Sequence, residues 1–83
     1  MENKISVISI IVEEMEATSL INSILHDFGQ YIVGRMGLPY REKKISIICV
    51  VLDAPPNITS ALSGKLGMIK GVKTKSITSK QNS

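Results

Sequence analysis

Two short stretches of this 83-residue chain are apolar at most positions, and they restrict the folds that it can adopt. They are residues 5–12, ISVISIIV, and residues 45–52, ISIICVVL, and both are rich in β-branched side chains. Short apolar runs of this kind are typical of buried β-strands. Neither approaches the roughly 18 apolar residues that a membrane-spanning helix needs. The sequence therefore predicts two central strands of one sheet and no membrane segment.

A helix is predicted after each apolar run. The first begins with Glu13-Glu14-Met15-Glu16, because acids favour the positive end of a helix dipole. Its apolar residues recur at helical spacing as far as Gly29, which is the expected C-cap. The second follows Pro55-Pro56, since proline fits a first turn but not a helix interior. Asn57 is its expected cap, and a helical repeat covers residues 58–69.

Two weaker strands complete a βαββαβ order: residues 31–38, which contain two glycines, and residues 72–78, which contain lysines. This order predicts an α+β, ferredoxin-like sandwich, with an antiparallel four-stranded sheet of order 4-1-3-2 and two helices on one face. The apolar runs become the central strands, and the weaker strands become edges, where glycine and lysine are tolerated. We expect one domain over residues 1–83, with an ordered core of about 4–79 and a frayed segment at 79–83.

Both faces of the predicted central strands are apolar. Ile8, Ile10 and Val12 alternate with Ile5, Val7 and Ile11, and residues 45–52 show the same two-sided pattern. Two helices cover one face of a sheet only, and a face left to water would be polar. We therefore expect the second face to pack against another copy of the chain, which gives a homodimer or a homotetramer.

The charge of the chain is unevenly distributed. Residues 1–53 contain five Lys or Arg against seven Asp or Glu, whereas residues 54–83 contain five lysines and no acid. A lysine-rich third suits phosphates, so a nucleic-acid-binding ferredoxin-like module is the alternative function. Lysines at this spacing are also typical of a solvated edge strand. RNA readers of this fold stack bases on aromatic side chains, and the two apolar runs contain none, so direct nucleic-acid contact is not expected.

The segment from Gly34 to Arg41, GRMGLPYR, is the candidate binding site. Two glycines beside an arginine in an edge strand permit close approach of a ligand, and arginine suits carboxylate or phosphate. The alternative is structural: the glycines form a bulge or admit a neighbouring subunit, and Arg35 pairs with a surface acid. We expect a small anionic effector to contact Gly34, Arg35, Met36, Gly37, Pro39, Tyr40 and Arg41.

Residues suited to catalysis or metal binding are scarce. With His26 as the one histidine and Cys49 as the one cysteine, a single chain cannot form an ordinary zinc site, so any metal would be shared between subunits. His26 is expected at the surface and Cys49 packed within the sheet. Lys65 lacks the upstream glycine loop of a phosphate-binding P-loop. We expect no cofactor, no catalytic residue and no enzymatic activity.

The cellular setting is predicted from the same scarcity of cysteine. One cysteine excludes an intramolecular disulfide framework, which indicates a reducing compartment. The N-terminal residues MENK run directly into a predicted strand without a signal-peptide pattern. We therefore expect a cytoplasmic protein.

Three stretches of the chain resemble the family of iron-only hydrogenase system regulators, which is similar to the ACT domain and to the C-terminal domain of the nickel-responsive repressor. They are residues 24–29 (ILHDFG), 31–42 (YIVGRMGLPYRE) and 62–67 (LSGKLG), and the resemblance extends over roughly residues 4–79. It implies a ferredoxin-like, oligomeric domain that senses a small effector and regulates hydrogenase production. The chain shows no DNA-reading helix or ribbon, so transcriptional action would require a regulatory partner protein or an unfamiliar surface.

The chain also departs from the proteins that this family resembles. Glu13-Glu14-Met15-Glu16 follows the first strand, where ACT domains that bind amino acids usually carry a glycine. The nickel-responsive repressor binds metal through several histidines and a cysteine, whereas this chain offers His26 and Cys49 alone. We therefore expect neither an amino-acid effector bound in the usual ACT manner nor nickel bound in the repressor's geometry.

Overall fold

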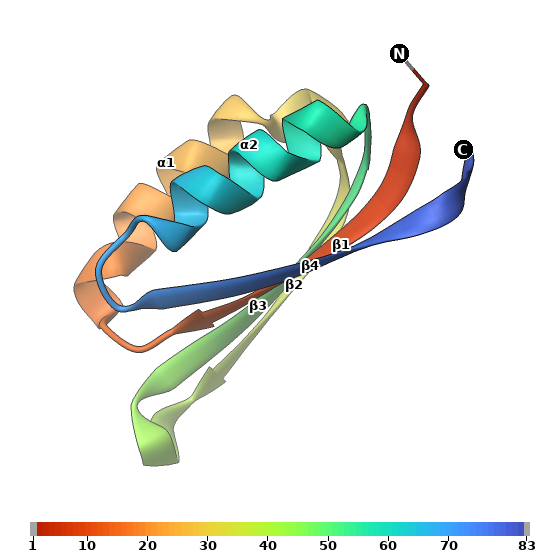
Figure 1. Cartoon of the computed structure of the whole chain (residues 1–83). Coiled ribbons are helices and arrows are strands. Elements are labelled where there is room, and N and C mark those ends of the chain that lie inside the picture. Colours follow the sequence, from red (N-terminus) through yellow and green to blue (C-terminus); the bar gives the residue numbers. More distant parts are fainter. Residues whose placement is uncertain (1, 83) are drawn as a thin grey trace.

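The computed structural model describes residues 2–82, and it describes the side chains of residues 2–80. Three short 3-10 turns lie at Met15–Ala17, Gly29–Tyr31 and Arg41–Lys43. The observed order of strands and helices is the predicted βαββαβ (Figure 1). Along the chain the elements are β1 (Lys4–Val12), α1 (Thr18–Asp27), β2 (Ile32–Tyr40), β3 (Ile45–Ala54), α2 (Pro56–Gly67) and β4 (Val72–Asn82).

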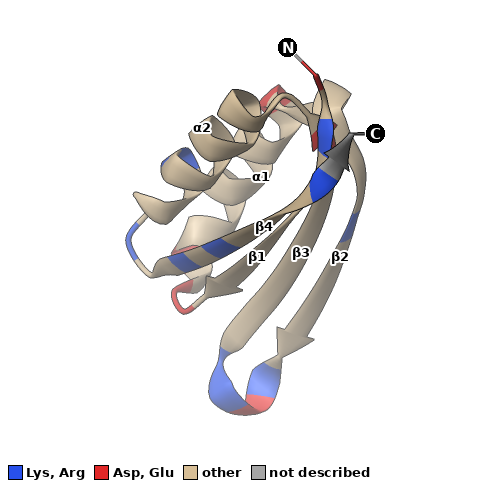
Figure 2. Cartoon of the chain, turned by 45° about the vertical axis from the view of Figure 1, so that its right-hand side comes forward, with Lys and Arg blue, Asp and Glu red and all other residues tan. Residues whose placement is uncertain are grey.

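The four strands form one sheet in the order β2-β3-β1-β4, and every neighbouring pair is antiparallel. The predicted order 4-1-3-2 is the same order read from the other edge, so this prediction is confirmed. Both helices lie on one face of the sheet (Figure 1). The β2–β3 hairpin extends beyond the end of β1, where Val12 pairs with Ser46, so its tip projects from the body (Figures 1 and 2).

The core fills the space between the sheet and the two helices. Ile8 and Val50 are opposite each other on β1 and β3, and both side chains are fully buried. A charge at either position would therefore damage the core rather than a surface between subunits. The helices meet these strands through apolar residues at spacings of four, which places them on one helix face. These helix residues are Ile21 and Leu25 on α1 and Leu62 and Leu66 on α2.

The start and the end of α1 differ from the prediction. Helix α1 begins at Thr18, whereas the acids before it form a bend and a 3-10 turn. The Glu13 N–H donates a hydrogen bond of 2.7 Å to the Gly71 carbonyl, which holds this segment against the start of β4 and delays the helix. Gly29 does not adopt the left-handed C-cap conformation; it opens the next 3-10 turn, and Phe28 is the C-cap.

Three further boundaries also differ. Pro55 is the N-cap of α2, and Asn57 lies inside the first turn without a capping side-chain hydrogen bond. Strand β3 continues to Ala54, two residues beyond the predicted end at 52. The segment that was expected to fray belongs to β4 as far as Asn82, because it pairs with the start of β1 at Lys4, and residue 83 lies outside the described residues.

Candidate functional site

The predicted site segment, residues 34–41, is divided between the two faces of the sheet. Arg35 is opposite the buried Val50, and its Nη2 donates a hydrogen bond of 3.0 Å to Asn22 Oδ1 on α1. Met36 is opposite Cys49 and lies on the face away from the helices, because successive side chains of a strand alternate. The seven predicted site residues therefore do not form one cluster.

An irregularity in β2 determines which residues face the helices. Ile32 is opposite Leu52, but Gly34 is opposite Val51, so the strand gains one residue relative to β3. Such a bulge moves all following side chains to the other face. Without it, Arg35 would lie on the face away from α1. Of the two glycines, only Gly34 adjoins this irregularity, because Gly37 pairs in regular register with Ile48.

The glycines themselves make no close contact within the chain. A Cβ atom added at Gly34 or at Gly37 would meet nothing within 4 Å in the structure. Among the described residues of one chain, none therefore packs closely against Gly34 or Gly37. The alternative pairing of Arg35 with a surface acid is absent among the described side chains, where Arg35 donates to the neutral amide of Asn22.

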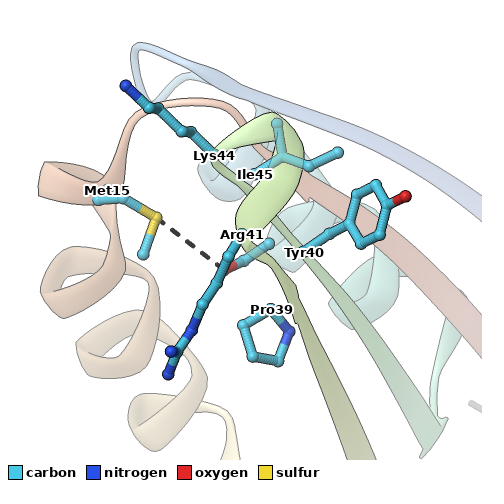
Figure 3. Close-up of a pocket in the computed structure, with 7 residues that line it drawn as sticks. Met15, Pro39, Tyr40, Arg41, Lys44 and Ile45 are labelled. Atoms are coloured by element: carbon cyan, nitrogen blue, oxygen red, sulfur yellow. Dashed lines mark hydrogen bonds between the residues drawn. The ribbon is translucent and has the colours of Figure 1, made fainter.

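A groove separates β2 from the beginning of α1. At the hairpin end is a depression of about 470 Å³, and Figure 3 shows Arg41 extending beside Met15 and Pro39 while Tyr40 points away. A second depression continues towards Arg35, and the two share Met15, Pro39 and Ser46. We call the combined feature the β2–α1 groove. Its lining includes Asn22, Arg35, Gly37, Arg41, Lys44 and Ile45.

Sequence reasoning found part of this groove and missed the rest. Arg35, Gly37, Pro39, Tyr40 and Arg41 were among the predicted site residues, and all of them line it. Met15, Lys44 and Ser46 were not predicted, since their positions depend on how α1 and the hairpin pack. The Ser46 hydroxyl donates a long hydrogen bond of 4.0 Å to Met15 Sδ, which joins the two walls (Figure 3).

The groove is bordered by positive charge. Arg35, Arg41 and Lys44 line it, and the hairpin tip is rich in basic residues (Figure 2). Among the side chains that the structure describes, the ion pair is Lys73 with Glu13 at 3.9 Å, so these three cations have no carboxylate partner there. The nearby Glu42 carboxylate accepts a hydrogen bond of 3.5 Å from the Tyr40 hydroxyl. The groove is therefore suited to an anion.

The sheet face away from the helices, which we call the open face, is largely apolar. Met36, Leu38 and Ile77 expose 72%, 60% and 75% of their surfaces. Ser9, Lys73 and Lys75 add polar groups on the β1–β4 side. The expected two-sided apolar pattern is thus present. Its other apolar members are Ile5, Val7, Ile11, Ile47, Cys49 and Val51.

His26 and Cys49 lie on opposite sides of the sheet. Cys49 lies in the central strand β3, as expected, where it is partly buried and faces the open face. His26 is exposed on α1, as expected for a surface histidine. The described residues include no group of three or more His, Cys, Asp or Glu side chains that could hold a metal ion. None of the described helices is long and apolar enough to cross a membrane.

The arrangement of the sheet and helices defines a small α+β domain of the ferredoxin-like, ACT-like class. The chain belongs to the TM1266-like family, described as "Iron-only hydrogenase system regulator, putative", whose model matches residues 4–76. It is similar to the solved structure of the uncharacterized protein TM1266 from Thermotoga maritima. The two chains are 38% identical with a TM-score of 0.90, and the match covers 95% of this chain and 100% of that one.

A more distant similarity concerns the fold alone. The chain aligns with a formyltetrahydrofolate deformylase from Pseudomonas putida KT2440 at 13% identity and a TM-score of 0.63. This match covers 87% of the present chain and 28% of the deformylase. No protein with a curated description matches the chain.

Proposed function

We propose that the chain is a non-enzymatic regulatory domain that assembles with further copies through its open face and responds to a small anionic effector in the β2–α1 groove. The description of its family as a regulator of the iron-only hydrogenase system supports the regulatory part. The observation that carries the proposal is the open face, because its exposed side chains include Met36, Leu38 and Ile77.

The size of the open face fits an interface between copies. Four strands about 4.8 Å apart and nine paired residues at about 3.4 Å give a face of roughly 19 by 30 Å. Side-chain relief increases the accessible area, which brings it near the roughly 800 Å² that each partner buries in a standard interface. Monomeric proteins rarely expose contiguous apolar patches larger than a few hundred Å². A second copy is the simplest partner, because a two-fold contact needs only one self-complementary surface.

The effector part of the proposal depends on charge. Arg35, Arg41 and Lys44 border one groove without a carboxylate partner among the described side chains. Cations that line a depression attract anions, and guanidinium groups bind carboxylate or phosphate through paired hydrogen bonds. The alternative of nucleic-acid binding is less well supported, because the open face presents aliphatic side chains where an RNA reader of this fold stacks aromatic ones.

The assembly is tested by placing a charge on the open face. Ile47→Glu introduces a carboxylate between Ile11 and Leu38, the neighbours of Ile47 on β1 and β2. We expect it to weaken association at least about 100-fold, because an unpaired charge buried in an interface is strongly destabilising. Leu20→Glu is the matched control, since Leu20 is similarly exposed but lies on α1. Sedimentation equilibrium and native mass spectrometry measure both variants.

Cys49 gives a second measurement of the same assembly. Its position on the open face predicts that its thiol is alkylated more slowly as the protein concentration rises through the association range. A parent protein that stays monomeric at about 100 μM would contradict the proposal. An Ile47→Glu variant that associates as strongly as the parent would also contradict it, because the contact would then involve another surface.

A further inference from the structure

The wall of the β2–α1 groove is apolar between its charged ends. Met15, which exposes 54% of its surface, lines the depression at the hairpin end together with Pro39 and Ile45. An inorganic anion would neutralise the bordering cations but would leave this hydrocarbon surface in water. Covering it with an aliphatic chain is favourable, because burying apolar surface is the main driving force of ligand binding in such pockets.

The positive charge and the apolar surface occupy the same depression. Figure 3 shows the Arg41 side chain extending beside Met15 and Pro39, so one ligand can contact its guanidinium group and the apolar wall together. Lys44 lines the same depression and adds positive potential. A planar carboxylate suits the guanidinium group, which can donate two parallel hydrogen bonds to it.

The other end of the groove is polar. There the Arg35 side chain donates to Asn22 Oδ1 at 3.0 Å, and Thr18 also lines the depression. Arg41 follows Arg35 by six positions, which corresponds to about 20 Å along an extended strand. An aliphatic chain of moderate length therefore lies between the two ends without reaching the polar one.

We propose that the β2–α1 groove binds a free medium-chain aliphatic carboxylate, with its carboxylate at Arg41 and its chain over Met15 and Pro39. This inference rests on the proposed function and specifies the chemical class of its effector. Recognition would then depend on both parts of the ligand, because neither the cation nor the apolar wall alone fills the depression.

The test is calorimetric titration of the full chain with acetate, butanoate and octanoate, each below the concentration at which it forms micelles. Full burial of a methylene group is worth about a fourfold gain in affinity, and a half-open groove about half of that effect, so we expect roughly a twofold gain per methylene. Octanoate should then bind about 16-fold more tightly than butanoate. Octylammonium and octan-1-ol, which present the same chain without the anion, should bind at least fivefold more weakly than octanoate.

Two pairs of variants locate the bound ligand. Arg41→Gln should weaken octanoate binding about five- to tenfold, whereas Lys43→Gln, on the same turn but outside the depression, should leave it unchanged. Met15→Gln should reduce the gain per methylene, whereas Met36→Gln, on the open face, should not. All four side chains are exposed, so the variants should keep the circular-dichroism spectrum of the parent.

The possible outcomes separate this inference from the proposed function. If acetate binds as tightly as octanoate and Arg41→Gln weakens that binding, the anion site stands and the aliphatic ligand is refuted. If octanoate binding resists Arg41→Gln but falls with Met36→Gln, the ligand occupies the open face and this inference is refuted. If none of these anions binds, the effector part of the proposed function fails as well.

Discussion

Gly71 is the position where one added methyl group should be most costly. Its φ of 79° lies in the left-handed region, where side chains with a Cβ are disfavoured by about 1–2 kcal/mol. A Cβ atom there would also lie 2.7 Å from Glu14 Cγ and 2.8 Å from Glu14 Cβ. The chain cannot easily retreat, because the Gly71 carbonyl accepts a 2.7 Å hydrogen bond from the Glu13 N–H.

Gly71→Ala should therefore lower the free energy of unfolding by about 2–3 kcal/mol, adding the overlap with Glu14 to the backbone strain. Gly64→Ala is the matched control, because Gly64 lies inside α2 and a Cβ there would meet nothing within 4 Å. Alanine is favoured over glycine in a helix by about 1 kcal/mol, so this variant should be more stable than the parent.

Both variants can be compared with the parent by thermal unfolding at one protein concentration, since association changes the melting temperature. For a domain of this size, 1 kcal/mol corresponds to a shift of about 4–8 °C. The melting temperature should fall for Gly71→Ala and rise for Gly64→Ala. Shifts of the same sign, or a Gly71→Ala variant as stable as the parent, would refute the reasoning about the left-handed turn.

Two further substitutions test the packing by chemical denaturation. Thr59→Val should raise the free energy of unfolding by about 1 kcal/mol, because the Thr59 hydroxyl is buried without a hydrogen-bond partner among the described residues; a loss of stability would show that the hydroxyl is satisfied. Leu62→Ala should cost about 2–5 kcal/mol because Leu62 is fully buried, whereas Leu20→Ala, at a site that is 51% exposed, should cost less than about 1 kcal/mol. Equal losses at the two leucines would contradict the assignment of the core.

Much of the fold was predictable because its signals are local. The apolar runs at residues 5–12 and 45–52 became the central strands β1 and β3, and both of their faces are apolar as expected. The element ends were less predictable, because contacts between distant residues determine them. Glu13 is held by Gly71, which postpones the start of α1, and Lys4 pairs with Asn82, which extends β4.

The candidate site was predictable in its residue types but not in its geometry. Residues 34–41 were selected for glycine and arginine, and Arg35 and Arg41 do line one groove. Met36 and Leu38 nevertheless extend over the open face, where they belong to the surface that we propose for assembly. The segment therefore serves two surfaces, and alternation along β2 separates them.

The βαββαβ order and the two-sided apolar sheet follow from the pattern of residues along the chain, because periodicity and alternation are properties of neighbouring residues. That Arg35 faces α1 and that Arg41 lies beside Met15 depends instead on how the strands pair and pack. The reason is the extra residue between Ile32 and Gly34. A shift of one position moves every following side chain of β2 to the other face of the sheet. That bulge exists only where β2 pairs with β3. Because β3 lies later in the chain, this pairing is present only once the sheet has formed.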